Sequence, residues 1–164
     1  MTRYARLALD DCRTALVQLR AQPTGLLWRV QWVAAVALLR SVGHVLDKVD
    51  GASDQRVRSI VDTAWRELND SKPEPAIFWK FIEEERNNVL KAYRTAAKQH
   101  VVVRPPTTHI DLATGDETES GGGPTLYLHV MADGPFAGQD PRDIVEMGIA
   151  WWEEYLTRID SQCT

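Results

Sequence analysis

The chain has 164 residues, with 19 lysines and arginines against 23 aspartates and glutamates, so its formal net charge is −4. Hydrophobic residues make up 44% of the sequence and charged residues 26%. These proportions are ordinary for a folded globular protein, and they exclude a disordered chain, a collagen-like chain and a disulfide-rich scaffold. A chain of this length corresponds to a single domain, which we expect to span residues 1–164.

The cysteines and the apolar segments predict a soluble cytoplasmic protein. Cys12 lies in a helical apolar pattern and Cys163 is the penultimate residue, and neither has a second ligand at metal-binding spacing. The N-terminal segment mixes leucines with Asp10 and Asp11, which is not typical of a signal peptide. The longest apolar run, 32–39, has eight residues, whereas a membrane-spanning helix needs about 20. We therefore expect no membrane contact, no metal and no cofactor.

The first half of the sequence predicts helices. Apolar residues recur at steps of three and four over residues 4–19, which is helical spacing. After a break at residues 22–25, two apolar stripes run along residues 26–49, so we expect this helix to be buried at the centre of a bundle. A third helix follows Ser53 or Asp54, because either side chain can cap its first turn.

The second half predicts two further helices with strands between them. Residues 75–98 continue the helical pattern, and Asp140 followed by Pro141 marks the start of the last helix. Between these helices the pattern changes to a weak alternation over residues 107–113 and 125–131, which is typical of the two strands of a β-hairpin.

The loop of this hairpin, residues 114–124, is acidic and contains three consecutive glycines. We expect either a disordered tip or a binding loop, and not a phosphate-binding loop, because no Gly-Lys-Ser/Thr ending and no helix follow the glycines. His109 and His129 lie on the two predicted strands and can face one another, but no third ligand completes a metal site. The predicted fold class is mainly all-α, a bundle of about five helices with a β-hairpin insertion at about residues 101–133.

The densest run of chemically useful side chains is residues 78–93. On a helix with about 100° per residue, Glu85 falls inside the apolar stripe, so its carboxyl group needs a buried partner. Arg40 and His44, one turn apart on the second helix, are the expected partners. Three interpretations are open: a buried structural ion pair or polar network that ties two helices, a functional polar cluster, or a Glu85 side chain that reaches solvent. The members of the functional cluster are Glu85, Arg86, Tyr93 and His44.

A basic segment follows directly after three glutamates. No acidic residue occurs from 87 to 110, although the chain as a whole is negative. Cations there suit the negative end of a helix dipole, and they also suit contact with a phosphate or a nucleic acid. The basic side chains of this segment are Lys91, Arg94, Lys98, His100, Arg104 and His109.

Residues 86–93, Arg-Asn-Asn-Val-Leu-Lys-Ala-Tyr, resemble the signature of the HEPN superfamily of small helical bundles. That signature is an arginine, a polar residue that is often asparagine, and a histidine four to six residues after the arginine, followed in one subgroup by a tyrosine. Arg86, Asn87 and Tyr93 match it, whereas Lys91 stands at the histidine position. The resemblance covers only these residues, on a long, late helix where the family carries its motif.

Active members of this superfamily are metal-independent ribonucleases, usually dimers that bring the arginine and the histidine together at the interface. The resemblance implies that Arg86, Asn87 and Tyr93 are the catalytic residues, with Arg86 stabilising the phosphate. Because lysine is a fixed cation at neutral pH, Lys91 can hold a phosphate but cannot move protons as a histidine does. The departure favours a non-cleaving binding or regulatory module for RNA or a protein, in a toxin–antitoxin or defence setting.

Two other functions stay open. One is a metal-independent endoribonuclease that uses Arg86 with Tyr93, Lys91 or a distant histidine. The other is a protein–protein scaffold with no nucleic-acid role.

Six tryptophans, against three phenylalanines and four tyrosines, are a further feature of the composition. Trp32 and Trp152 fall on core stripes. The tryptophans beside or off those stripes are Trp28, Trp65, Trp79 and Trp151. Trp79 falls on the same side of the fourth helix as Arg86 and Tyr93. Because aromatic residues concentrate in buried interfaces, we expect this side to be covered by a second copy in a homodimer or by another element of the chain.

Overall fold

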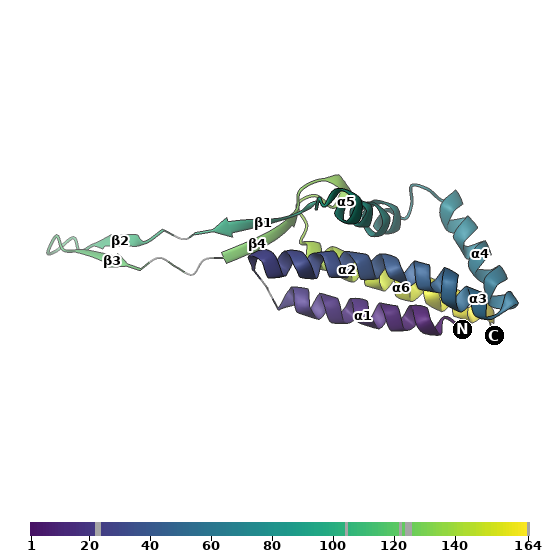
Figure 1. Cartoon of the computed structure of the whole chain (residues 1–164). Helices are drawn as coiled ribbons and strands as arrows, with labels where there is room; N and C mark the ends of the chain where they lie inside the picture. The colour runs from purple at the N-terminus through teal and green to yellow at the C-terminus, as the bar shows by residue number, and fades with distance from the viewer. Residues whose placement is uncertain (22–23, 104, 122, 124–125, 164) are drawn as a thin grey trace.

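The computed structural model describes residues 1–21, 24–103, 105–121, 123 and 126–163. This part of the chain is mainly helical, with five helices and two small two-stranded sheets that precede the last helix. Figure 1 shows the helices side by side in one elongated body, with the strands drawn out from one end of it as an arm. The predicted fold class is confirmed.

Two π-helical segments are continuous with α-helices, and one 3-10 turn lies between the last strand and the last helix. The helical segments in chain order are α1 (Arg3–Arg20), α2 (Gly25–Val45), η1 (Leu46–Asp50), α3 (Gly51–Ser53), α4 (Gln55–Asp70), η2 (Ile77–Glu83), α5 (Glu84–Ala92), η3 (Gly134–Phe136) and α6 (Pro141–Cys163). The π-helical η1 joins α2 to α3, and the π-helical η2 runs directly into α5. Five continuous helices result.

The helix starts predicted from the sequence have their caps in place. The side chain of Asp54 accepts a hydrogen bond from the backbone N–H of Arg56 (2.7 Å) at the start of α4. Asp140 accepts one from the backbone N–H of Arg142 (2.9 Å) at the start of α6. Each bond satisfies a backbone donor that has no partner within its own helix.

A third cap reaches across the bundle. The buried side chain of Asp50, at the end of η1, accepts hydrogen bonds from the backbone N–H groups of Tyr4 (3.0 Å) and Ala5 (2.8 Å). The carboxylate therefore satisfies two free donors at the start of α1 and ties the first helix to the second.

The fourth helix is shorter than predicted. It ends at Ala92, whereas the periodicity predicts helix to residue 98. Tyr93 adopts the left-handed conformation (φ 52°), which ends the helix. Beyond it, the backbone N–H of Ala96 donates to the carboxyl group of Glu85, and the chain enters the first strand of the arm. This end is set by contacts with distant residues, which local periodicity does not report.

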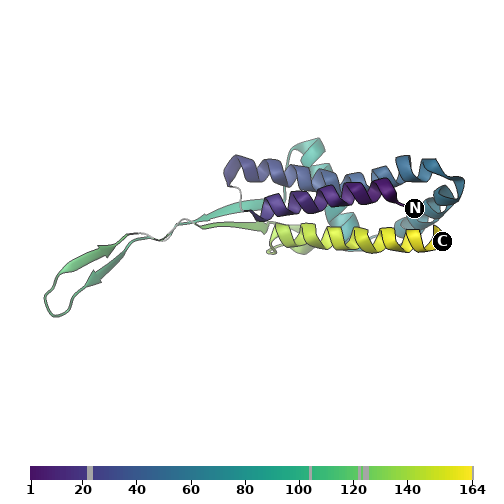
Figure 2. The same cartoon turned by 90° about the horizontal axis from the view of Figure 1, so that it is seen from below.

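The arm consists of two antiparallel strand pairs in series. The strands are β1 (Ala97–Val102), β2 (Thr107–Ile110), β3 (Glu117–Ser120) and β4 (Leu126–Met131). β1 pairs with β4 at the base of the arm, and β2 pairs with β3 at its tip. Figure 2, seen from below, shows the same ribbon leaving the helical body and ending far from it.

The predicted pairing of residues 107–113 with 125–131 is therefore wrong. The chain reverses at residues 111–116, where the backbone N–H of Asp111 donates to the carbonyl of Asp116 (2.9 Å) and Gly115 has a positive φ of 75°. This turn lets β2 pair with β3, which occupies part of the predicted loop, and leaves β4 to pair with β1.

Two smaller expectations about the hairpin change with this register. His129 lies opposite Gln99 and His109 lies opposite Thr118, so the two histidines do not face one another. In the glycine-rich part of the predicted loop, residues 122 and 124 lie outside the described residues.

The core lies between the helices, and most of the tryptophans are in it. Trp32 and Trp152 are fully buried, as predicted from their stripes. Trp28 and Trp79 are also buried, whereas Trp65 is 43% exposed. The largest other fully buried side chains are Phe78, Phe81, Leu9, Leu19, Leu39, Ile82, Ile144, Leu156, Ile159 and Val36.

One helix in the described residues is long and apolar enough, by length and composition alone, to cross a membrane. It is the continuous helix of residues 25–53, in which about a third of the most apolar window is buried inside the fold. The core helix of a soluble bundle meets the same criterion, and this helix places Trp32, Val36 and Leu39 in the core.

Candidate functional site

The carboxyl group of Glu85 joins three elements at the base of the arm. Its Oε1 accepts hydrogen bonds from Trp32 Nε1 (3.2 Å) on α2, from Thr95 Oγ1 (3.0 Å) and from the backbone N–H of Ala96 (3.0 Å). The Glu85 side chain is 3% exposed, as the helical pattern predicts. The group therefore fixes the segment that leads from α5 into the arm.

The expected partners of Glu85, Arg40 and His44, are not its partners in the structure. Glu85 meets α2 at Trp32, and Arg40 lies eight residues further along that helix, or about 12 Å at 1.5 Å per residue. Arg40 and His44 instead line a cavity near the other end of α2. The expected ion pair with Arg40 or His44 is therefore wrong, whereas the alternative of a buried polar network that ties two helices agrees with the hydrogen bonds of Glu85 to three uncharged donors.

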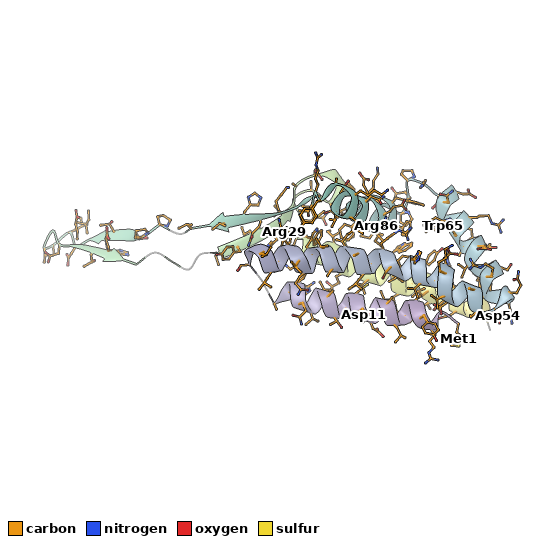
Figure 3. All side chains as sticks on the ribbon, viewed as in Figure 1. Met1, Asp11, Arg29, Asp54, Trp65 and Arg86 are labelled. Atoms are coloured by element: carbon orange, nitrogen blue, oxygen red, sulfur yellow. The ribbon has the colours of Figure 1, made fainter. Side chains whose placement is uncertain are left out.

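The residues that resemble the HEPN signature are not brought together around a reacting centre. The guanidinium of Arg86 donates from Nη1 to Oδ1 of its neighbour Asn87 (2.9 Å) and has no ion pair in the described part of the chain. Tyr93 is 71% exposed, and the guanidinium carbon of Arg29 lies over its ring, 5.4 Å from the ring centroid. Lys91 is exposed. Figure 3 labels Arg86 on α5 and Arg29 near the start of α2.

Trp79 does not share a face with Tyr93. It lies in the π-helical η2, where the wider turn shifts its direction from that of an α-helix. Trp79 packs against Trp65 (ring centroids 5.9 Å apart) and Phe78 (4.8 Å), and the ammonium of Lys72 lies 3.8 Å from its ring centroid. Trp79 is therefore covered by elements of its own chain.

The basic residues of the segment after α5 are exposed around the base of the arm. Lys91 is in the last turn of α5, Arg94 follows the helix and Lys98 is on β1. None of the three has an ion-pair partner among the residues that the structure describes. Together with Arg29 they form the basic base of the arm, which we define as Arg29, Lys91, Arg94 and Lys98.

The tip of the arm has the opposite charge. Four exposed carboxylates lie on the turn and on β3, and we call them the acidic tip: Asp111, Asp116, Glu117 and Glu119. The two ends of the arm thus carry opposite charges, separated by the length of the ribbon (Figures 1 and 2).

Between its two ends the arm exposes apolar side chains. Val103 is 67% exposed and Leu112, at the turn, is 98% exposed. The other large apolar side chains exposed on the arm are Val101, Val102, Ile110, Leu126, Tyr127 and Leu128. The sequence carries this signal as β-branched and aromatic residues in short runs, but exposure follows only from the ribbon having no helix against it.

The base of the arm is anchored to α2 by aromatic stacking. His129, on β4, stacks on Trp28 with ring centroids 4.3 Å apart and is 3% exposed. Burial lowers the pKa of His129, and the positive charge of Arg142 lowers it further against the opposing effect of Asp140. On the other strand, Gln99 Oε1 accepts from the backbone N–H of Gly25 (3.3 Å).

The described residues hold no cluster of three histidine, cysteine, aspartate or glutamate side chains arranged to bind a metal. Cys12 is buried, and burial raises the pKa of its thiol to about 12, so it is not a reactive nucleophile at neutral pH. The chemistry available in the described region is therefore that of charge, hydrogen bonding and apolar contact.

Comparison with known proteins finds no protein-family model, no curated protein and no solved structure that matches this chain. The resemblance to the HEPN superfamily stays a prediction that rests on residues 86–93.

Proposed function

We propose that this chain is a non-catalytic binding module that acts through its arm, and that a second copy of the chain is the partner that the arm engages. The observation that carries the proposal is the arm itself, an apolar ribbon with a basic base and an acidic tip. The proposal keeps the soluble, non-membrane character predicted from the composition.

The isolated ribbon calls for a partner on physical grounds. A two-stranded antiparallel ribbon is at best marginally stable in water, and its two open edges present unpaired backbone N–H and C=O groups. Its exposed valines, leucines and Tyr127 are distributed along the described part of the ribbon, and several large apolar side chains left exposed on one element are typical of contact sites. A partner that lies along the ribbon buries these side chains and can pair with an open edge.

The charges favour a second copy as this partner. When two arms lie side by side in opposite directions, the acidic tip of each reaches the basic base of the other. Such a pairing is self-complementary and closes into a two-fold dimer. An RNA partner fits less well, because the four carboxylates of the tip repel phosphates.

Catalysis has weaker support. Arg86 is engaged with Asn87, Tyr93 points to solvent with Arg29, and the position of the family's histidine is occupied by the exposed Lys91. No general base is provided within this motif, so the residues fit a binding role better than a ribonuclease.

Charge reversal tests the dimer. Lys91→Glu, Arg94→Glu and Lys98→Glu together reverse the sign of the base, and Asp116→Lys, Glu117→Lys and Glu119→Lys together reverse the sign of the tip. We expect the full-length protein to dimerise in sedimentation equilibrium at low salt, and each reversed variant to dimerise at least about tenfold more weakly. A protein with both sets of substitutions regains the dimer, because the charges of the two ends are then exchanged. A wild-type chain that stays monomeric, or a combined variant as weak as the single ends, contradicts the proposal.

Wild type, Arg86→Ala and the variant with the reversed base decide between the alternative functions. RNA is incubated with wild type and Arg86→Ala in the presence of EDTA, and neither is expected to cleave it. Cleavage that Arg86→Ala abolishes establishes the metal-independent ribonuclease instead. Salt-dependent RNA binding by wild type that the reversed base abolishes, without any dimer, makes RNA the partner.

A further inference from the structure

A cavity of about 250 Å³ lies at the end of the bundle away from the arm, near the position of Trp65 in Figure 3. It is enclosed by α2, α4, η2 and α6 and is separate from the arm and from residues 86–93. Its walls combine aromatic side chains with one unpaired cation. The residues that matter for its chemistry are Arg40, Gly43, His44, Trp65, Phe78, Trp152 and Tyr155.

Arg40 supplies a positive charge that nothing in the described fold neutralises. Its guanidinium forms no ion pair there, and its buried Nε has no hydrogen-bond partner. The two carboxylates beside the cavity are engaged elsewhere, since Arg58 donates to Asp47 (2.5 Å) and to Asp62 (3.4 Å). A buried donor of a charged group is normally paired, so Arg40 has the capacity to accept an anion.

Trp65, which lines the cavity and is 43% exposed, offers an accessible ring to a flat apolar body, and Phe78 and Trp152 form a buried aromatic floor in the same lining. Phe78 and Trp152 pack edge to face with centroids 5.8 Å apart, and Tyr155 lies 5.6 Å from Trp152. Trp152 is 2% exposed, and its Nε1 is a second buried donor without a partner among the described residues. Aromatic walls with a few polar groups are the usual lining of a small-molecule site.

Gly43 lets Trp152 and Arg40 pack closely against the backbone of α2. A Cβ at this position would lie 2.8 Å from Cη2 of Trp152 and 3.3 Å from Nη1 of Arg40. Glycine inside a helix is less favourable than alanine by about 0.5–1 kcal/mol, so local helix stability does not account for it. The close approach of the indole and of the guanidinium accounts for it, and this approach sets the position of Arg40 in the cavity.

We propose that this cavity binds a small aromatic carboxylate, with the carboxylate on the guanidinium of Arg40 and the ring against the accessible indole of Trp65. His44, one turn beyond Arg40 and exposed at the rim, is a further donor for the same group. Arginine suits this role because its planar fork matches the two oxygens of a carboxylate. The site goes beyond the proposed function, which concerns the arm.

The test uses the full-length protein and three probes. Phenylacetate carries both the charge and the ring, phenylacetamide carries the ring without the charge, and inorganic phosphate carries charge without a ring. Binding is followed by two-dimensional NMR, in which the backbone signal of Gly43 and the indole N–H signal of Trp152 report on the cavity. We expect phenylacetate to shift both signals saturably and to bind at least about tenfold more tightly than phenylacetamide or phosphate.

Variants assign the binding to Arg40. Arg40→Met keeps the length of the side chain and removes its charge, and we expect it to weaken phenylacetate binding about 10- to 100-fold. Arg56→Met, on the exposed surface of α4, leaves binding unchanged, and Gly43→Ala weakens it by displacing the indole of Trp152 and the guanidinium of Arg40. Equal binding by Arg40→Met and wild type, or no shift with any probe, overturns the proposal. If Arg40→Met does not fold, the comparison of phenylacetate with phenylacetamide on the wild-type protein decides.

Discussion

At the scale of single residues, Glu85 shows how one buried polar group organises its surroundings. A carboxyl group in an apolar stripe is costly without partners, and here three donors from two parts of the chain, α2 and residues 95–96, meet one oxygen. The residue therefore connects α2, α5 and the segment that leads into the arm. Although Glu85 directly precedes residues 86–93, its three partners are structural and give it no catalytic environment.

Replacing Glu85 tests this role. Glu85→Ala leaves Trp32 Nε1 and the backbone N–H of Ala96 buried without an acceptor, and we expect a loss of about 2–4 kcal/mol in the free energy of unfolding. Glu85→Gln keeps an acceptor oxygen and is expected to lose less. Urea denaturation followed by circular dichroism measures both. The matched control is Glu84→Ala on the exposed side of α5, with a change below about 0.5 kcal/mol; equal losses at both positions contradict the assignment.

His129 gives the base of the arm a dependence on pH. Its pKa is lowered in the fold from the ordinary 6.5, chiefly by burial against Trp28. Below pH 6.5 the unfolded chain takes up a proton at this side chain that the folded chain does not, so stability falls as the pH falls.

We expect the melting temperature to decrease from pH 7 to pH 5, and to decrease less in His129→Phe, which keeps the stack without titrating. The slope that one histidine can contribute is at most about 1.4 kcal/mol per pH unit. Thermal melts of both proteins at the two pH values measure the difference. The neighbouring charges of Arg142 and Asp140 are present in both proteins and cancel in the comparison. Parallel pH profiles would refute the assignment.

At the scale of elements, the arm and the bundle differ in how they are held together. The helices share a continuous apolar core, whereas the described residues of the arm beyond Val102 and Leu126 contribute no side chain to that core. Stability of the bundle should therefore not depend on the distal arm.

Shortening the arm tests this separation. Replacing residues 103–125 by Asn-Gly connects Val102 directly to Leu126, which lie opposite each other, through a tight two-residue turn. We expect the melting temperature of the bundle to stay within about 5 °C of wild type, because few buried contacts are removed. The dimer is expected to be lost in sedimentation. A chain that unfolds on this change shows that the arm is part of the core, and a dimer that persists places the interface elsewhere.

At the scale of the whole molecule, the first and last helices close the bundle. Asp160 on α6 accepts hydrogen bonds from the backbone N–H (2.8 Å) and the hydroxyl (2.9 Å) of Thr2, and from Arg6 Nε (3.0 Å). These bonds hold the pKa of Asp160 below its ordinary value, against the opposing effect of burial. The two chain ends thus meet at the end of the body opposite the arm, as Figure 2 shows.

The helices and their starts follow from the sequence. The structure agrees with the predicted apolar stripes, with the caps at Asp54 and Asp140, and with the burial of Trp32, Trp152 and Glu85. These features could be predicted because each is indicated by residues a few positions away in the sequence. Other features depend on the tertiary structure. The helix α5 ends at a residue in the left-handed conformation, Tyr93. Glu85 finds a partner on α2, and the side chain of Trp79 is directed by a π-helical turn. No local pattern contains that information.

By itself the sequence determined the fold class, one helical body with a β insertion, because amphipathic periodicity and capping are local properties. Only the tertiary structure decided the features on which function depends. It paired β1 with β4 and β2 with β3 to make an arm with opposite charges at its ends. It also placed Arg40, far from Glu85, on a cavity beside Trp152. The strand pairing and the position of Arg40 both follow from contacts between residues that are distant along the chain. Tertiary packing determines these contacts, and the residues next to them in the sequence do not.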